Sequence, residues 1–141
     1  MKQAIATVEA PPAIGPYAQA IKVNDMVFVS GQLPLNPKTR QLITGDIAAQ
    51  TEQVLVNIRA ILEEADASLA DVVKVTIYLK DLNQFDVVNK IYAYFFPNLE
   101  TSTNLLPARS TVEVSRLPRD ADIEIDCIAV ISKGYMAPEL Y

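Results

Sequence analysis

The C-terminal third of the chain constrains its fold most, because two segments there alternate between apolar and polar residues. Successive side chains of a β-strand point to opposite faces, so the alternation predicts strands at 108–114 and 121–131. Pro118, in the connection between them, suits a turn better than a central strand. We therefore predict a β-hairpin in which Arg109 lies opposite Glu124, on the face away from the apolar stripe.

A guanidinium beside a carboxylate is a candidate reaction centre. The arginine can hold an anionic substrate while the carboxylate activates a water molecule next to it. Such pairs are also common on protein surfaces, where each contributes only about 0–1 kcal/mol. The hairpin alone therefore leaves a plain surface ion pair as the alternative to an active site.

The composition excludes many kinds of site. The chain has no histidine and one cysteine, so no Ser-His-Asp triad, Cys-His dyad or zinc site of these residues can form. Four glycines cannot build a glycine-rich nucleotide-binding loop. The net charge of −5 argues against a nucleic-acid partner. We expect chemistry from carboxylates, Arg, Lys, Tyr, hydroxyls and backbone groups, with neither a nucleotide cofactor nor a metal.

The length of 141 residues indicates one domain, covering 1–132, followed by a tail at 133–141 that shows no pattern. No apolar run approaches the ~20 residues that span a bilayer, and the N-terminus has no apolar signal segment. A single cysteine fits a reducing compartment. We expect a cytoplasmic protein without a membrane partner.

Two amphipathic helices are predicted, one over 47–65 and capped by Asp46, the other over 82–95 and capped by Asp81. Further strands are predicted at 3–8, 17–23, 26–30 and 72–79. The resulting order, β-β-β-α-β-α-β-β, predicts an α+β fold with a single mixed sheet and two helices on one face. The uncovered face carries an apolar patch, which is more often an interface than bare surface. We expect a homo-oligomer that buries this patch, with a pocket where subunits meet; the patch residues are Val72, Thr76, Tyr78, Ile128 and Val130.

Short motifs distributed over 3–132 resemble the RidA (YjgF) family in their order and spacing. The C-terminal signature consists of Pro107-Ala108-Arg109, Val112, Ser115, Leu117 and Ile123-Glu124-Ile125, and it follows Gly15-Pro16-Tyr17, Val29-Ser30-Gly31-Gln32, Gln50-Thr51, Val73-Lys74, and Asn89 ahead of Tyr92 and Phe95-Phe96. The resemblance implies a chorismate-mutase-like α+β fold, assembled as a homotrimer with sites at the subunit interfaces.

The same resemblance implies an activity: hydrolytic deamination of 2-iminobutanoate, 2-iminopropanoate and their enamine tautomers to 2-oxo acids and ammonia. This is a form of metabolite damage control that uses no cofactor. Arg109 is then expected to bind the substrate carboxylate, and Glu124 to position and deprotonate the attacking water. Other positions that match the family pocket are Tyr17, Ser30, Gly31, Asn89 and Phe85.

Several of these residues have a structural alternative. Tyr17 and Phe85 are equally expected as packing residues, Ser30-Gly31 as the end of a strand, and Asn89 on a solvated helix face. Thr111 departs from the family, since many imine-hydrolysing members carry cysteine two residues after the arginine. A threonine can hydrogen-bond the substrate but cannot form a thiolate.

Two other functions are open at this stage. A trimeric binding module could hold 2-oxo acids on Arg109 without catalysis. The family is also associated with ribonuclease and chaperone-like behaviour. The negative charge and lack of histidine argue against a ribonuclease, and a chaperone needs apolar surface that the trimer is expected to bury.

Overall fold

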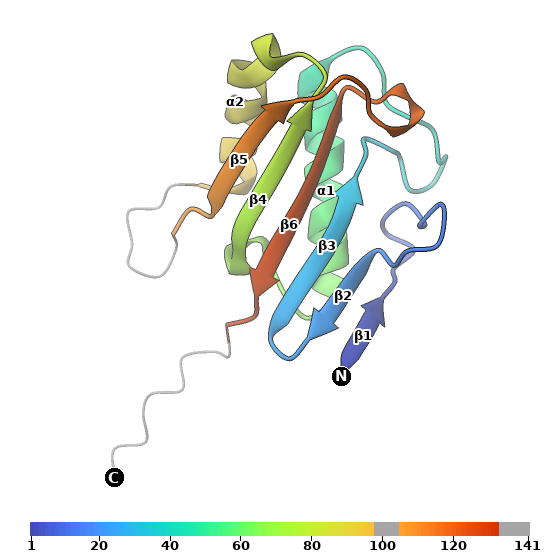
Figure 1. Ribbon diagram of the computed structural model, residues 1–141, viewed down its shortest axis with the longest axis vertical. Coiled ribbons are helices and arrows are strands. Elements are labelled where there is room, and N and C mark those ends of the chain that lie inside the picture. The colour runs from blue at the N-terminus through green and yellow to red at the C-terminus, as the bar shows by residue number, and fades with distance from the viewer. Residues whose placement is uncertain (98–104, 133–141) are drawn as a thin grey trace.

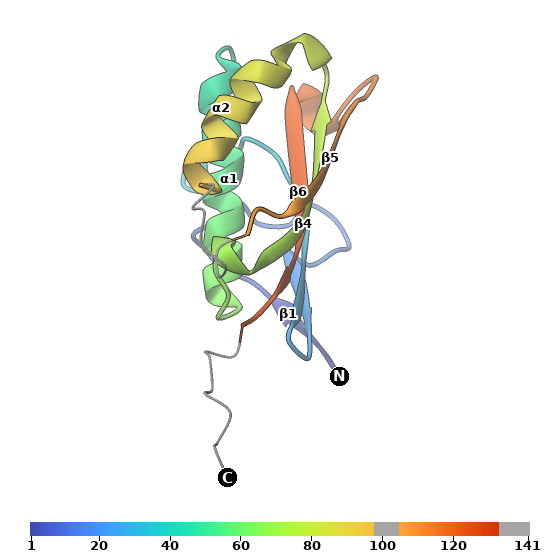
Figure 2. The same cartoon turned by 90° about the vertical axis from the view of Figure 1, so that its left-hand side faces the viewer.

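A computed structural model describes residues 1–97 and 105–132. In this part of the chain, six strands form one sheet and two helices pack on one of its faces (Figures 1 and 2). The predicted α+β class is confirmed, whereas the predicted tail at 133–141 lies outside the described residues. The elements are β1 (Lys2–Ile5), β2 (Ala20–Val23), β3 (Met26–Gln32), α1 (Ile47–Glu64), β4 (Val72–Leu79), α2 (Phe85–Phe95), β5 (Ala108–Glu113) and β6 (Ile123–Val130).

The first helix begins where the sequence predicts, whereas α2 begins at Phe85, three residues after the predicted start at 82. The Asp46 carboxylate accepts a hydrogen bond from the backbone N–H of Ala48 at 2.9 Å, which caps α1. Asp81 caps the short 3-10 turn Leu82–Gln84 that leads into α2. The inner stripe of α1 packs on the sheet and is almost fully buried. None of the described helices is long and apolar enough to cross a membrane.

The strand order is β1-β2-β3-β6-β4-β5, with β4 and β5 parallel and the other neighbours antiparallel. The parallel pair is connected through α2, as a crossover requires. The strand β6 lies in the middle of the sheet, and its inward residues, Ile123, Ile125, Cys127 and Ala129, are at most 3% exposed. The only cysteine of the chain is therefore part of the core, as predicted.

The predicted hairpin of 108–114 with 121–131 is wrong, because β4 lies between β5 and β6. Arg109 pairs with Val75, and Glu124 pairs with Tyr78 on the other side of the same strand. The alternation of residues specifies which faces a strand presents, but it does not specify its neighbours. The connection from β5 to β6 is long enough to cross over β4 and insert β6 at the centre.

Arg109 also faces the opposite way from the prediction. Arg109 lies on the same face of the sheet as its pairing partner Val75, and Thr111 on the same face as Ile77. Val75 and Ile77 are both buried under the helices. Glu124 faces outward, as predicted. Within one subunit, Arg109 and Glu124 therefore lie on opposite faces of the sheet and cannot form the predicted pair.

Two smaller corrections concern the strand ends. The strand β2 begins at Ala20, so Tyr17 lies in the loop before it and not in a strand. The pairing of β4 with β6 shifts between Val72 and Lys74, which buries Val72 and leaves Val73 45% exposed on the outer face. The register shift had no signal in the alternation and was not predicted.

We expect Ile77→Ala to lower the free energy of unfolding by about 2–5 kcal/mol, because it leaves a cavity in a fully buried position of β4. Urea denaturation measures this change. The control is Val87→Ala, which removes a comparable side chain from a 39% exposed position of α2. Equal effects of the two substitutions would contradict the assignment of Ile77 to the core.

Candidate functional site

The predicted site residues form two clusters. The first surrounds a cavity of about 420 Å³, the Glu124 cavity, whose lining includes Tyr17, Ser30, Gly31, Glu124 and Arg119. Its walls come from the loop before β2, the end of β3, the segment after it, and the start of β6. Four of these residues belong to three sequence motifs that are far apart in the chain, and the fold brings them together at one place.

Gly31 allows the Glu124 carboxylate to occupy its position. A Cβ atom added at Gly31 would lie 2.8 Å from the carboxyl carbon and from Oε2 of Glu124, closer than real contacts allow. The register of β3 against β6 shifts between Val29 and Gln32, so β3 bulges beside the carboxylate. The Ser30-Gly31 pair is thus more than the end of a strand, since its shape places Glu124.

The other walls are held by side chains that bind backbone. Gln19 is buried, and its amide donates to the carbonyl of Pro11 at 2.8 Å and accepts from Thr7 N–H at 2.7 Å. The Ser30 hydroxyl donates to the carbonyl of Ala18 at 2.6 Å, so its proton is already committed. Tyr17 is 52% exposed and its hydroxyl accepts from Ile14 N–H. Tyr17 is therefore a cavity wall and not a core residue.

Burial raises the pKa of Glu124, and the negative charge of Asp126 raises it further. The Tyr78 hydroxyl donates to Asp126 at 3.0 Å and not to Glu124. Among the described residues, the Glu124 carboxylate accepts no hydrogen bond, so its lone pairs are free for a ligand or a water molecule. A half-buried carboxylate of raised basicity is suited to act as a general base.

The second cluster surrounds the Arg109 guanidinium. Phe85, Asn89 and Tyr92 lie on one face of α2 and point at β5, as their spacing of four and three residues requires. The guanidinium carbon lies 4.7 Å from the centre of the Tyr92 ring and 5.5 Å from that of Phe85. Arg109 Nη2 also donates a hydrogen bond to Asn89 Oδ1. We call these four residues the Arg109 clamp.

Tyr92 is the site residue that the sequence analysis missed, since it was named there only as a position of the family motif. Its spacing from Phe85 and Asn89 was the available signal. Burial raises the pKa of Tyr92 to about 12, although the Arg109 charge opposes this, so the ring stays neutral beside the cation. Phe85, for which packing was the alternative expectation, is 38% exposed, and its ring lies against the guanidinium.

Thr111 lies two residues after Arg109 and faces the same way. Its hydroxyl is buried and has no hydrogen-bond partner among the described residues. A buried hydroxyl without a partner costs about 1–3 kcal/mol, which a bound ligand can offset. The Arg109 clamp with Thr111 therefore presents a guanidinium and an unpartnered hydroxyl, separated from the Glu124 cavity by β4.

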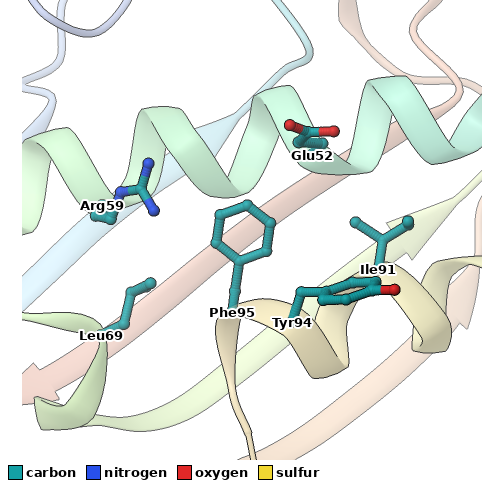
Figure 3. Close-up of a pocket in the computed structure, with 6 residues that line it drawn as sticks. All are labelled: Glu52, Arg59, Leu69, Ile91, Tyr94 and Phe95. Carbon is teal, nitrogen blue, oxygen red and sulfur yellow. The ribbon is translucent and has the colours of Figure 1, made fainter.

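A further hollow of about 400 Å³ lies between α1 and α2 on the helical face (Figure 3). The Arg59 guanidinium lies over the Phe95 ring, 5.5 Å from its centre. None of the predicted site residues lines this hollow. Within residues 1–97 and 105–132, no group of three or more Cys, Asp or Glu side chains is arranged to hold a metal ion.

The sequence profile of the family described as Endoribonuclease L-PSP matches residues 7–131. The chain belongs to this family. A 2-iminobutanoate/2-iminopropanoate deaminase of Escherichia coli is 48% identical over 130 residues, which cover 92% of this chain and 98% of the relative. A RutC family protein of Pyrococcus abyssi is 54% identical over 128 residues, covering 91% of this chain and 96% of the relative. The resemblance to the RidA family is confirmed.

Solved structures agree with this membership. The crystal structure of the YjgF gene product of E. coli has a TM-score of 0.84 at 48% identity, covering 91% of this chain and 98% of its own. That of E. coli TdcF with bound serine has a TM-score of 0.85 at 41% identity, covering 92% and 99%. The mixed sheet with two helices is thus shared with solved members of the family.

We expect Asp126→Asn to lower the pKa of Glu124, because it removes the neighbouring negative charge while keeping an oxygen that can accept from Tyr78. Carboxyl ¹³C NMR titration measures the pKa of Glu124 directly. Asp46→Asn, at the cap of α1, is the control and should leave the Glu124 pKa unchanged. A Glu124 pKa that does not move in Asp126→Asn would contradict the assigned cause.

Proposed function

We propose that this protein hydrolyses reactive 2-imino acids, of which 2-iminobutanoate and 2-iminopropanoate are the leading candidates, to 2-oxo acids and ammonia. The observation that carries this proposal is the Glu124 carboxylate, half-buried in a cavity, with a raised pKa and no hydrogen bond from the described residues. The E. coli relative that bears the name of this activity supports the choice of substrate.

We further propose that the complete site forms between subunits of a homotrimer. The Arg109 clamp and the Glu124 cavity are on opposite faces, so one subunit cannot bring both to the same small molecule. In a cyclic assembly, two different surfaces of the same chain meet at every interface. The outer face of the sheet also exposes apolar side chains that an interface would cover: Met26, Phe28, Val73, Val112 and Val130.

Arg109 binds the substrate carboxylate in this proposal. Its guanidinium can donate two parallel hydrogen bonds, which fix the orientation of a carboxylate as well as its position. The rings of Phe85 and Tyr92 and the amide of Asn89 restrict the guanidinium before the substrate arrives. Such preorganisation lowers the entropy that must be lost on binding. The Thr111 hydroxyl supplies a further donor at the position where many relatives carry cysteine.

Glu124 acts on water. It takes a proton from the water molecule as the oxygen attacks the imine carbon, and the resulting carbon–nitrogen single bond then breaks. The first proton passes to the nitrogen, and the proton of the newly formed hydroxyl follows it as the C=O bond forms, so one imino acid and one water give one 2-oxo acid and one ammonia. The backbone carbonyl of Gly31 can accept from the imine N–H. No covalent intermediate is needed, which is consistent with Thr111 in place of a thiol.

Neither alternative is favoured by an observation. A ribonuclease, which the description of the family names, would need a basic surface, whereas the chain has a net charge of −5 and no histidine. A binding module that holds 2-oxo acids would use Arg109 but would have no use for the basicity of Glu124. The first assay below separates this module from the enzyme.

Decay of 2-iminobutanoate, released in situ by a threonine dehydratase and followed by semicarbazide trapping, should be faster with the protein. We expect Glu124→Gln to reduce kcat by about 10²–10⁴-fold, because it removes the base, while binding of 2-oxobutanoate persists. Arg109→Ala should lose that binding. Absence of acceleration, with Arg109-dependent binding of 2-oxobutanoate, would instead establish the binding module.

In the wild type, kcat/KM should fall as the pH drops through the raised pKa of Glu124, since the base must be ionised.

Mixing the two inactive variants tests the shared site. When Arg109→Ala and Glu124→Gln subunits are unfolded together and refolded, about a quarter of the interfaces should contain an intact Arg109 and an intact Glu124, which restores activity. Each variant refolded alone is the control. If activity does not return although mixed trimers form, the site is not divided between subunits.

A further inference from the structure

Arg119 brings a second guanidinium to the Glu124 cavity, and the proposed chemistry does not use it. The residue lies in the 3-10 turn Pro118–Asp120, in the connection from β5 to β6, and it lines the same cavity as Glu124. Arg119 Nη1 donates to the carbonyl of Arg40 at 3.3 Å. Among the described residues it forms no ion pair, and the carboxylate that shares the cavity with it is that of Glu124.

The backbone at Arg119 is held in an unusual conformation. Arg119 and Asp120 have φ angles of 59° and 58°, and Arg40, which accepts its hydrogen bond, has 62°. For a residue other than glycine, this left-handed backbone conformation costs about 1 kcal/mol or more. Such strain persists only where the surrounding structure imposes it. Leu117 is buried at the start of the turn, and Arg116 pairs with Asp120 at 2.8 Å. The position of Arg119 is therefore set by the fold.

The cavity offers more room than the reacting atoms need. Its volume of about 420 Å³ compares with ~30 Å³ for one water molecule in the liquid, and an imino acid reacts only at the carbon beside its carboxylate. The substrate side chain must then occupy part of the remaining space. The apolar wall that it can reach includes Leu33, Leu35 and Pro118. Arg119 adds a positive charge to this lining, and it forms no ion pair among the described residues.

We infer that Arg119 selects substrates by the charge of their side chain: it disfavours imino acids with a cationic side chain and admits neutral and anionic ones. This inference rests on the proposed function and adds the class of substrate to it. The physical reason is Coulomb repulsion in a partly enclosed cavity, where water screens charges less than in bulk.

The test compares imino acids that an amino-acid oxidase generates from methionine, glutamate and arginine. For each, kcat/KM is measured with the wild type and with Arg119→Glu. We expect the arginine-to-methionine ratio of kcat/KM to rise by about tenfold in Arg119→Glu and the glutamate-to-methionine ratio to fall by a similar factor. High salt should shrink both changes.

The control is Arg59→Glu, which makes the same change of charge in the hollow between the helices (Figure 3) and should leave both ratios unchanged. Arg119→Asn is a milder variant that tolerates the left-handed backbone and should shift the ratios part of the way. Unchanged ratios in both Arg119 variants, with the methionine-derived imine still hydrolysed, would overturn this inference alone. A wild type that hydrolyses none of the three would overturn the proposed function and the inference with it.

Discussion

The position of β4 between β5 and β6 is the constraint on which the rest of the structure depends. Since β4 and β5 are parallel, the chain must cross the sheet through α2 between them, and this crossover lays α2 over β5. Arg109 therefore lies under a helix whose facing side chains are Phe85, Asn89 and Tyr92. The return from β5 then inserts β6 at the centre of the sheet, where its outward residue Glu124 faces away from that helix.

A few close contacts set the chemical properties of Glu124 and Arg109 within this topology. The absence of a side chain at Gly31 lets a carboxylate approach the bulge of β3, and the hydrogen bond from Tyr78 goes to Asp126 and leaves Glu124 unpartnered. Burial then makes this carboxylate a stronger base than an exposed one. On the other face, two aromatic rings and an amide hold a cation. In the proposed trimer, assembly then only has to bring these two preformed surfaces together.

Much of the fold could be predicted from the sequence, because periodicity and capping are local. Asp46 caps α1 as predicted, Asp81 caps the 3-10 turn that leads into α2, and the inward residues of β6 form the core. The pairing of strands was not predictable in this way, since alternation at 108–114 and 121–131 is the same for a hairpin and for two strands separated by a third. The wrong strand pairing also led to the wrong prediction of the sheet face on which Arg109 lies. The bulge at Ser30-Gly31 depends on contacts between distant segments, which single-sequence periodicity cannot reveal. The spacing of Tyr92 placed it on the helix face of Phe85 and Asn89, but periodicity could not reveal that this face lies against Arg109.

The burial of Cys127 has a consequence for the durability of the protein. Burial raises the pKa of this thiol to about 12, and it is the only cysteine in the chain. At neutral pH the protein thus carries almost no thiolate, and thiolates are the form that electrophiles and oxidants attack. Imines are themselves electrophiles. With Thr111 beside Arg109 and its one sulfhydryl buried in the core, the protein would offer the substrates of the proposed reaction no reactive thiol.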